Sequence, residues 1–102
     1  MYYGYKLLYR SHDNKLYCWR QLNPSEYIEH KELKKEQYRL DNGFMVYASL
    51  ENAINKSKFY AIKPIEIWQV NYKEIVSNSE FQGIKHLIVN NMRLVKYVME
   101  IN

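Results

Sequence analysis

The residues able to bind a metal or act as a nucleophile are few and widely spaced in this sequence. The histidines are His12, His30 and His86, and the single cysteine is Cys18. A zinc site needs closely spaced Cys and His ligands, so we predict no metal site. The two neighbours of Cys18 are aromatic and offer no base to generate a thiolate. We therefore expect a buried, unreactive thiol, unless folding brings His30 or His86 close to it.

The other candidate groups have simple structural interpretations. His86 alternates with apolar neighbours, which is typical of a strand residue, and His12 and Asp13 lie in a polar cluster typical of a turn. Only three glycines are present, and no two are close enough to form a glycine-rich loop around phosphates. We expect no nucleotide triphosphate site of that type and no cofactor.

Composition indicates one folded domain spanning residues 1–102. Hydrophobic residues make up 47% of the 102 positions and charged residues 25%, which is ordinary for a globular protein. A lone cysteine forbids an intramolecular disulfide, and no segment reaches the roughly 20 apolar residues of a membrane span. We expect no membrane association and a cytoplasmic location. The net charge of +4 is mildly basic, less than a dedicated nucleic-acid binder usually carries.

Residue patterns predict the elements that must position any site. We expect a hairpin of strands over residues 2–10 and 15–22, a polar excursion with one or two helical turns over residues 27–40, and a strand over residues 44–47. Ser49 is a good N-cap for a helix over about residues 50–59, and residues 65–72 read as a central strand. The remaining expectations are a loop over residues 77–83 and a hairpin turning at Asn90 and Asn91.

Together these elements predict an α+β fold. The expected architecture is a single compact domain with a largely antiparallel sheet of five to six strands. One main helix packs on one face of that sheet.

Three stretches together resemble the mono-ADP-ribosyltransferase plan: "LYRS" at residues 8–11, "GFMVYAS" at residues 43–49 and "IEIWQV" at residues 65–70. The resemblance implies that Arg10 holds dinucleotide phosphates, that Ser49 stands for one Ser of the family's strand motif, and that Glu66 is the catalytic acid. The Glu-x-Glu or Gln-x-Glu pattern of that family is absent. Without a ligand, the same residues read as a solvated cation, a helix cap and a polar strand residue. We favour that interpretation, and with it a non-enzymatic protein.

The chain as a whole is similar in style to accessory proteins of phages and mobile elements. It is short, rich in Lys, Asn and Tyr, and has the α+β layout of that class, which includes inhibitors of host-defence nucleases. This similarity implies an interaction module that binds a protein or nucleoprotein partner, in the cytoplasm of a bacterial host cell. A minimal ADP-ribosyltransferase-like enzyme or dinucleotide-binding relic is the alternative, and a direct nucleic-acid binder is a third.

Two regions are the candidate partner-binding surface. The polar excursion carries basic residues that no core pattern requires, and the N-terminus carries three tyrosines in four residues, more than one strand face can bury. A terminal strand could also pair with the edge of a second copy, giving a homodimer. The candidate residues are Lys31, Lys34, Lys35, Arg39, Tyr2, Tyr3 and Tyr5.

Overall fold

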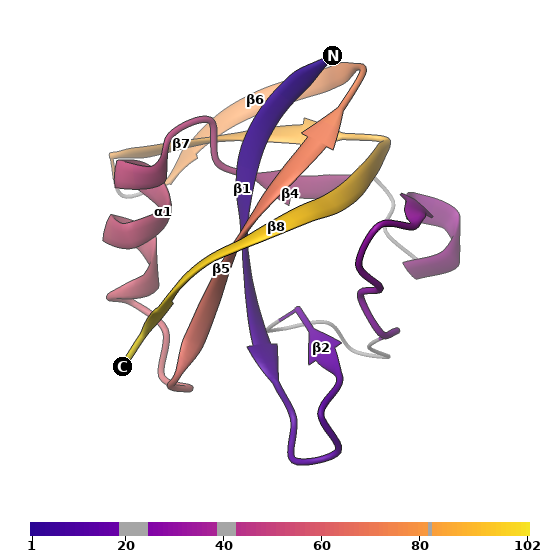
Figure 1. The fold of residues 1–102 in the computed structure, drawn as a ribbon. Helices are drawn as coiled ribbons and strands as arrows, with labels where there is room; N and C mark the ends of the chain where they lie inside the picture. The colour runs from indigo at the N-terminus through magenta and orange to yellow at the C-terminus, as the bar shows by residue number, and fades with distance from the viewer. Residues whose placement is uncertain (19–24, 39–42, 82) are drawn as a thin grey trace.

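Two antiparallel sheets form the fold, which a computed structural model describes for residues 1–18, 25–38, 43–81 and 83–102 (Figure 1). One sheet has five strands in the order β2-β1-β5-β8-β3, and the other has three in the order β4-β7-β6. The predicted α+β class, with one main helix, is confirmed. The strands are β1 Tyr2–Arg10, β2 Leu16–Tyr17, β3 Glu32–Lys34, β4 Phe44–Val46, β5 Ile65–Tyr72, β6 Ile75–Phe81, β7 Ile84–Val89 and β8 Asn91–Ile101.

Strand β5 is the centre of the larger sheet, as its continuous apolar pattern predicts. It pairs with β1 on one side and β8 on the other, and its residues alternate between two buried clusters. Ile65 and Ile67 pack in a cluster with Ala53 of the helix, whereas Trp68 and Val70 belong to a second cluster. Burial on both faces explains why this strand carries so few exposed polar residues.

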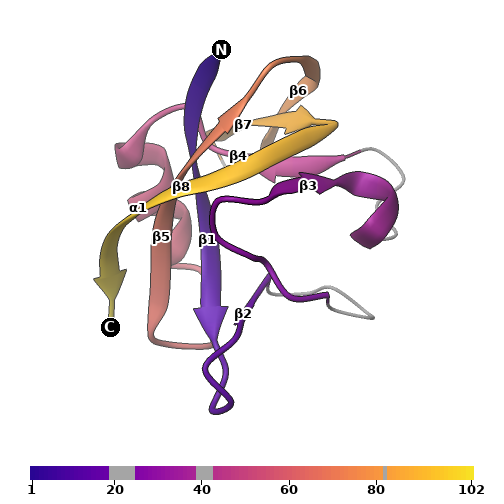
Figure 2. The same ribbon diagram turned by 45° about the vertical axis from the view of Figure 1, so that its right-hand side comes forward.

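The helix α1, Leu50–Ser57, begins where the sequence predicts. The Ser49 hydroxyl accepts a hydrogen bond from the Asn52 backbone N–H at 3.1 Å, which satisfies one of the donors left open in the first turn. The helix ends two residues before the expected position 59. It lies against β1, β5 and β7, on the side of the molecule opposite β3 (Figures 1 and 2).

The C-terminal third is organised differently from the prediction. Residues 77–83 were expected to form a loop, but β6 covers most of them and pairs with β7 in a hairpin. The predicted hairpin at Asn90 and Asn91 is also wrong, because β7 pairs with β4 and β6 while β8 pairs with β5 and β3. The chain therefore crosses from one sheet to the other at Asn90. Local sequence cannot distinguish such a crossing from a turn.

The polar excursion is more ordered than its composition suggests. It contains strand β3 and a 3₁₀ turn at Lys35–Tyr38, the latter matching the expected helical turn. Tyr27, Leu33 and Tyr38 are buried in the core cluster that contains Trp68. Three buried side chains at irregular spacing fix this segment to the sheet, although they form no periodic stripe.

The opening hairpin is confirmed for the residues that the structure describes. Strand β1 has the predicted bounds, and Tyr9 and Arg10 pair with Tyr17 and Leu16. Two predictions lie outside the described residues: the continuation of the second strand over residues 19–22 and the candidate residue Arg39. Within residues 1–18, 25–38, 43–81 and 83–102, no helix has the length and apolar composition needed to cross a membrane.

Candidate interaction site

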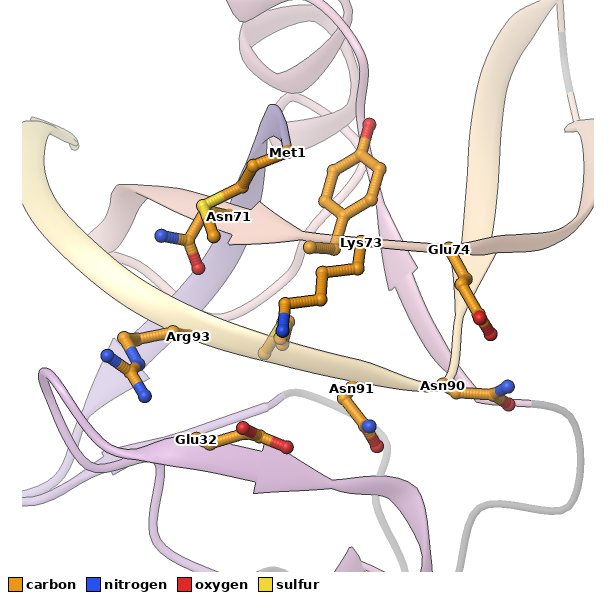
Figure 3. A pocket seen from close by; sticks show the side chains of 10 residues that line it. Met1, Glu32, Asn71, Lys73, Glu74, Asn90, Asn91 and Arg93 are labelled. Carbon is orange, nitrogen blue, oxygen red and sulfur yellow. The ribbon is translucent and has the colours of Figure 1, made fainter.

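A hollow of about 400 Å³ lies where the two sheets meet near the N-terminus. Four chain segments form its walls: the start of β1, the end of β5 with the turn that follows, the crossing between β7 and β8, and strand β3. Figure 3 shows the Lys73 side chain extending from the end of β5 toward β8. The lining residues are Met1, Glu32, Asn71, Tyr72, Lys73, Glu74, Asn90, Asn91, Met92 and Arg93.

Four charged side chains line this hollow without neutralising one another. They are Glu32, Lys73, Glu74 and Arg93. In the described part of the chain, Arg10 forms an ion pair with Glu66, and His30 Nε2 lies 3.1 Å from the Glu29 carboxylate. Neither contact involves any of these four. Glu32 and Arg93 are directly opposite each other on β3 and β8, yet they form no ion pair. The hollow therefore presents two cations and two anions that a ligand or partner could engage.

One residue at the edge of the hollow, Asn90, carries a buried acceptor without a donor. The side-chain oxygen of Asn90 is buried, and no hydrogen-bond partner for it exists among the residues the structure describes. A buried amide oxygen without a partner costs free energy, so such groups are usually satisfied by protein, water or a ligand. Asn71 and Asn91 add further amide groups to the same wall. The chemistry is suited to hydrogen bonding with polar groups rather than to an apolar ligand.

The exposed side chains of Met1 and Tyr3 lie at one rim of the hollow, whereas Tyr2 lies on the opposite face of β1. Met1, Tyr2 and Tyr3 are 72%, 55% and 56% exposed. The Tyr2 ring stacks on Tyr72 with centroids 5.7 Å apart, and Tyr3 is the cross-strand partner of Asn71. Burial, together with the neighbouring Tyr2 hydroxyl, raises the pKa of Tyr72, so its phenol stays protonated at neutral pH.

Tyr5 is placed differently from the other two candidate tyrosines. Its backbone N–H and C=O exchange hydrogen bonds with Tyr47 at 2.7 and 2.8 Å. Its ring is half-buried and packs against the cluster beneath the helix. Tyr5 thus joins β1 to the segment that precedes α1.

Strand β3 and the 3₁₀ turn form the opposite rim. Lys34 is the cross-strand partner of Asn91, and the Lys35 backbone N–H donates to the Asn90 C=O at 3.1 Å. Lys31 and Lys34 are exposed and Lys35 is half-buried. The two regions predicted from sequence therefore lie on either side of one hollow. Arg39 lies outside the described residues.

The three residues of the transferase resemblance do not form a joint site. The Arg10 guanidinium binds the Glu66 carboxylate through two hydrogen bonds, of 2.8 and 3.1 Å, and the remaining Nη1 faces Asn14. Ser49 lies two residues after Tyr47, and Tyr47 pairs with Tyr5 of β1. Arg10 lies five residues further along the same strand, roughly 17 Å from Tyr5. Ser49 caps the helix at the far end of β1.

The negative charge of the Glu66 carboxylate is balanced within the fold by Arg10. Burial raises the pKa of its carboxyl, but the hydrogen bonds from Arg10 and Trp68 lower the pKa by more than burial raises it. The pKa of Glu66 therefore lies below the ordinary value of 4.5. At neutral pH this carboxylate is ionised and both of its oxygens accept hydrogen bonds, so it is a poor proton donor. The arrangement supports a structural role for Arg10 and Glu66.

His86 and Cys18 occupy separate environments. His86 Nε2 lies 2.5 Å from the Ser79 hydroxyl, its cross-strand partner, and its ring packs edge-on against Tyr47. Burial, with the positive charges of Lys56 and Lys6, lowers the pKa of His86, so its imidazole is neutral at pH 7. Cys18 is half-buried and packs against the core cluster that contains Tyr27.

Most of the lining residues carry no signal in the sequence. Asn71, Lys73, Glu74 and Arg93 are ordinary polar residues near strand ends, and only the meeting of four segments brings them to one hollow. Asn90 and Asn91 carry a turn signal, which predicts the wrong connection. Comparison with protein-family models, curated proteins and solved structures finds no match for this chain.

Proposed function

We propose that this protein is a small, non-enzymatic interaction module that binds a protein or nucleoprotein partner through the hollow between the N-terminus and β3. The observation that carries the proposal is the combination of unpaired charges inside the hollow with the exposed aromatic side chain of Tyr3 at its rim. Tyr and Arg are the residues that most often dominate binding energy at protein interfaces. Tyr3 and Arg93, which both have Asn71 of β5 as their cross-strand partner, supply both types on one face of the sheet.

Charge distribution favours a protein surface over bare nucleic acid. Glu32 and Glu74 line the hollow between the cations, and Glu36 is exposed beside Lys35. A phosphate backbone would meet these carboxylates as well as the lysines, which reduces its attraction. A partner with both acidic and basic side chains can pair with all of them.

The similarity to phage accessory proteins determines which partner to test first. A host-defence nuclease is itself bound to nucleic acid, and it presents both protein and phosphate surfaces. The basic residues Lys31 and Lys34 suit the phosphate part, and the tyrosine rim suits the protein part. We therefore propose an inhibitor of such a nuclease.

Matched variants of the chain test this proposal. The tagged protein is used to capture bacterial partners, from infected and uninfected cells, and affinity for the captured partner is then measured by calorimetry. Arg93→Ala and Tyr3→Ala are expected to reduce affinity tenfold or more, roughly the effect of removing an interface hot spot. Lys96→Ala is the control, because Lys96 is exposed on the same strand as Arg93 and lies outside the hollow.

Three results separate the alternatives. A partner that binds wild type and the Arg93→Ala and Tyr3→Ala variants equally would contradict the proposed surface. Binding to plain DNA or RNA that weakens steeply with salt would favour the direct nucleic-acid binder. Heat released on titration with a dinucleotide, abolished by Arg10→Ala in a folded variant, would favour the transferase-like alternative.

A further inference from the structure

Strand β6 has an open outer edge that no other part of the described chain covers. It lies at the end of the order β4-β7-β6 and pairs only with β7. All six side chains from Ile75 to Glu80 are exposed, including Ile75 at 43% and Val76 at 51%. The other edge strands, β2, β3 and β4, are only two or three residues long. β6, with seven residues, is the longest open edge.

The register of the β6–β7 hairpin determines which backbone groups face outward. Phe81 pairs with Ile84 and only two residues separate them, so this pair must exchange hydrogen bonds with each other. Antiparallel pairs alternate, and therefore Ser79 and Ser77 also bond to β7, whereas Asn78 and Glu80 do not. The N–H and C=O groups of Asn78 and Glu80 point away from the sheet.

We propose that two copies of this chain associate through antiparallel pairing of their β6 edges. A two-fold axis at Ser79 places Asn78 of one copy opposite Glu80 of the other, and the reverse. Each of these two pairs exchanges two backbone hydrogen bonds, which uses every outward group identified above. The result is one continuous sheet of six strands.

The side chains agree with self-pairing in this register. An Asn78 amide opposite a Glu80 carboxylate can donate a hydrogen bond to it, and this happens at both ends of the contact. The two Glu80 side chains are not opposite each other, so they add no direct repulsion. β6 contains no Lys or Pro, the residues that usually protect an edge strand, and the bulge at Val76 lies outside the paired positions. A symmetric contact with no charge clash favours a second copy over an unrelated strand.

This association is independent of the hollow and of the proposed function. The measurement is the sedimentation mass of the full chain as its concentration rises, with amide hydrogen exchange followed by NMR on the same samples. We expect a concentration-dependent dimer in which the amides of Asn78 and Glu80 become protected. The amides of Ser77 and Ser79 are the internal control, because β7 already protects them.

Substitutions at Asn78 test the register. Asn78→Asp places a carboxylate opposite Glu80 at both ends and is expected to weaken the dimer, whereas Asn78→Lys places an ammonium there and is expected to strengthen it. Cross-strand charge pairs predict changes of roughly 2- to 30-fold in the dissociation constant, in opposite directions. Asn78→Pro removes the outward N–H without removing a β6–β7 hydrogen bond, and should give a monomer.

The outcomes decide the proposal in both directions. Opposite shifts for Asn78→Asp and Asn78→Lys support it, even if Asn78→Pro does not fold. A chain that stays monomeric at about 1 mM overturns the proposal. The proposal is also overturned if β6 binds an unrelated strand but the chain does not dimerise. A dimer whose Asn78 and Glu80 amides exchange as fast as in the monomer also overturns it.

Discussion

Arg10 and Glu66 are 56 positions apart in the sequence, and their side chains meet in an ion pair with Nε 2.8 Å from Oε2. The second guanidinium nitrogen, Nη2, donates to Oε1 at 3.1 Å, and Trp68 Nε1 donates to the same oxygen at 2.9 Å. The pair connects the end of β1 to the central strand β5. Two of the three residues that the transferase resemblance assigns to a site are thus used to hold two strands together.

Replacing Glu66 with Gln should destabilise the fold. Glu66 is only 7% exposed, and the amide of Gln loses the charge and one acceptor while Arg10 remains. Because Arg10 is partly solvated, we expect a loss of about 1–2 kcal/mol in the free energy of unfolding. Urea denaturation at pH 7 measures it, with Glu36→Gln on the exposed 3₁₀ turn as the control. Equal midpoints for the two variants would show that the pair contributes nothing.

Stability should also fall in acid because of Glu66. Its folded pKa lies below the ordinary value of 4.5, so its contribution is fully present above pH 4.5 and is lost as the pH falls through the folded value. Urea denaturation from pH 6 to pH 2.5 measures this dependence. Glu66→Gln should show a smaller decrease than wild type over that range. Parallel curves for the two proteins would contradict the lowered pKa.

Replacing Ser49 with Ala should lower the free energy of unfolding, and no catalytic activity should depend on this residue. The Ser49 hydroxyl caps α1 through the Asn52 N–H, and loss of such a cap costs about 1 kcal/mol. Ser49→Asp keeps an acceptor at this position and should retain most of the stability. Thermal denaturation of the two variants provides the comparison. If Asp destabilises as much as Ala, the hydroxyl has a function other than capping.

Replacing Gly4 with Ala should be more damaging than its position near the N-terminus suggests. A Cβ at this position would lie 2.9 Å from the backbone oxygen of Tyr47 and 3.2 Å from the Tyr72 ring. Tyr47 is fixed there by its hydrogen bonds to Tyr5, so we expect a loss of about 1–3 kcal/mol. Gly83→Asn is the control, because its surroundings are open and Asn tolerates positive φ. A Gly4→Ala protein as stable as wild type would show that β1 and Tyr47 can move apart.

The sequence by itself determined the elements whose signals are local. The apolar run of β5, the aromatic and aliphatic composition of β1 and the cap at Ser49 depend on residues close together in the chain, and the structure has all three as predicted. The sequence also indicated two candidate contact regions, because three tyrosines at one end and several lysines in one segment exceed what a small core can use.

Only the tertiary structure decided how these elements meet. Whether Asn90 turns a hairpin or crosses between sheets depends on which strands are free to pair with β7 and β8, and those strands lie far away in the chain. The polar residues 77–80 become a strand because β7 supplies hydrogen bonds, not because of their own propensity. Lys6 is 3% exposed and donates to the Met45 C=O at 2.7 Å, a burial that its alternating pattern on β1 does not reveal. Pairing and burial are long-range properties, and they alone bring the four segments of the hollow together.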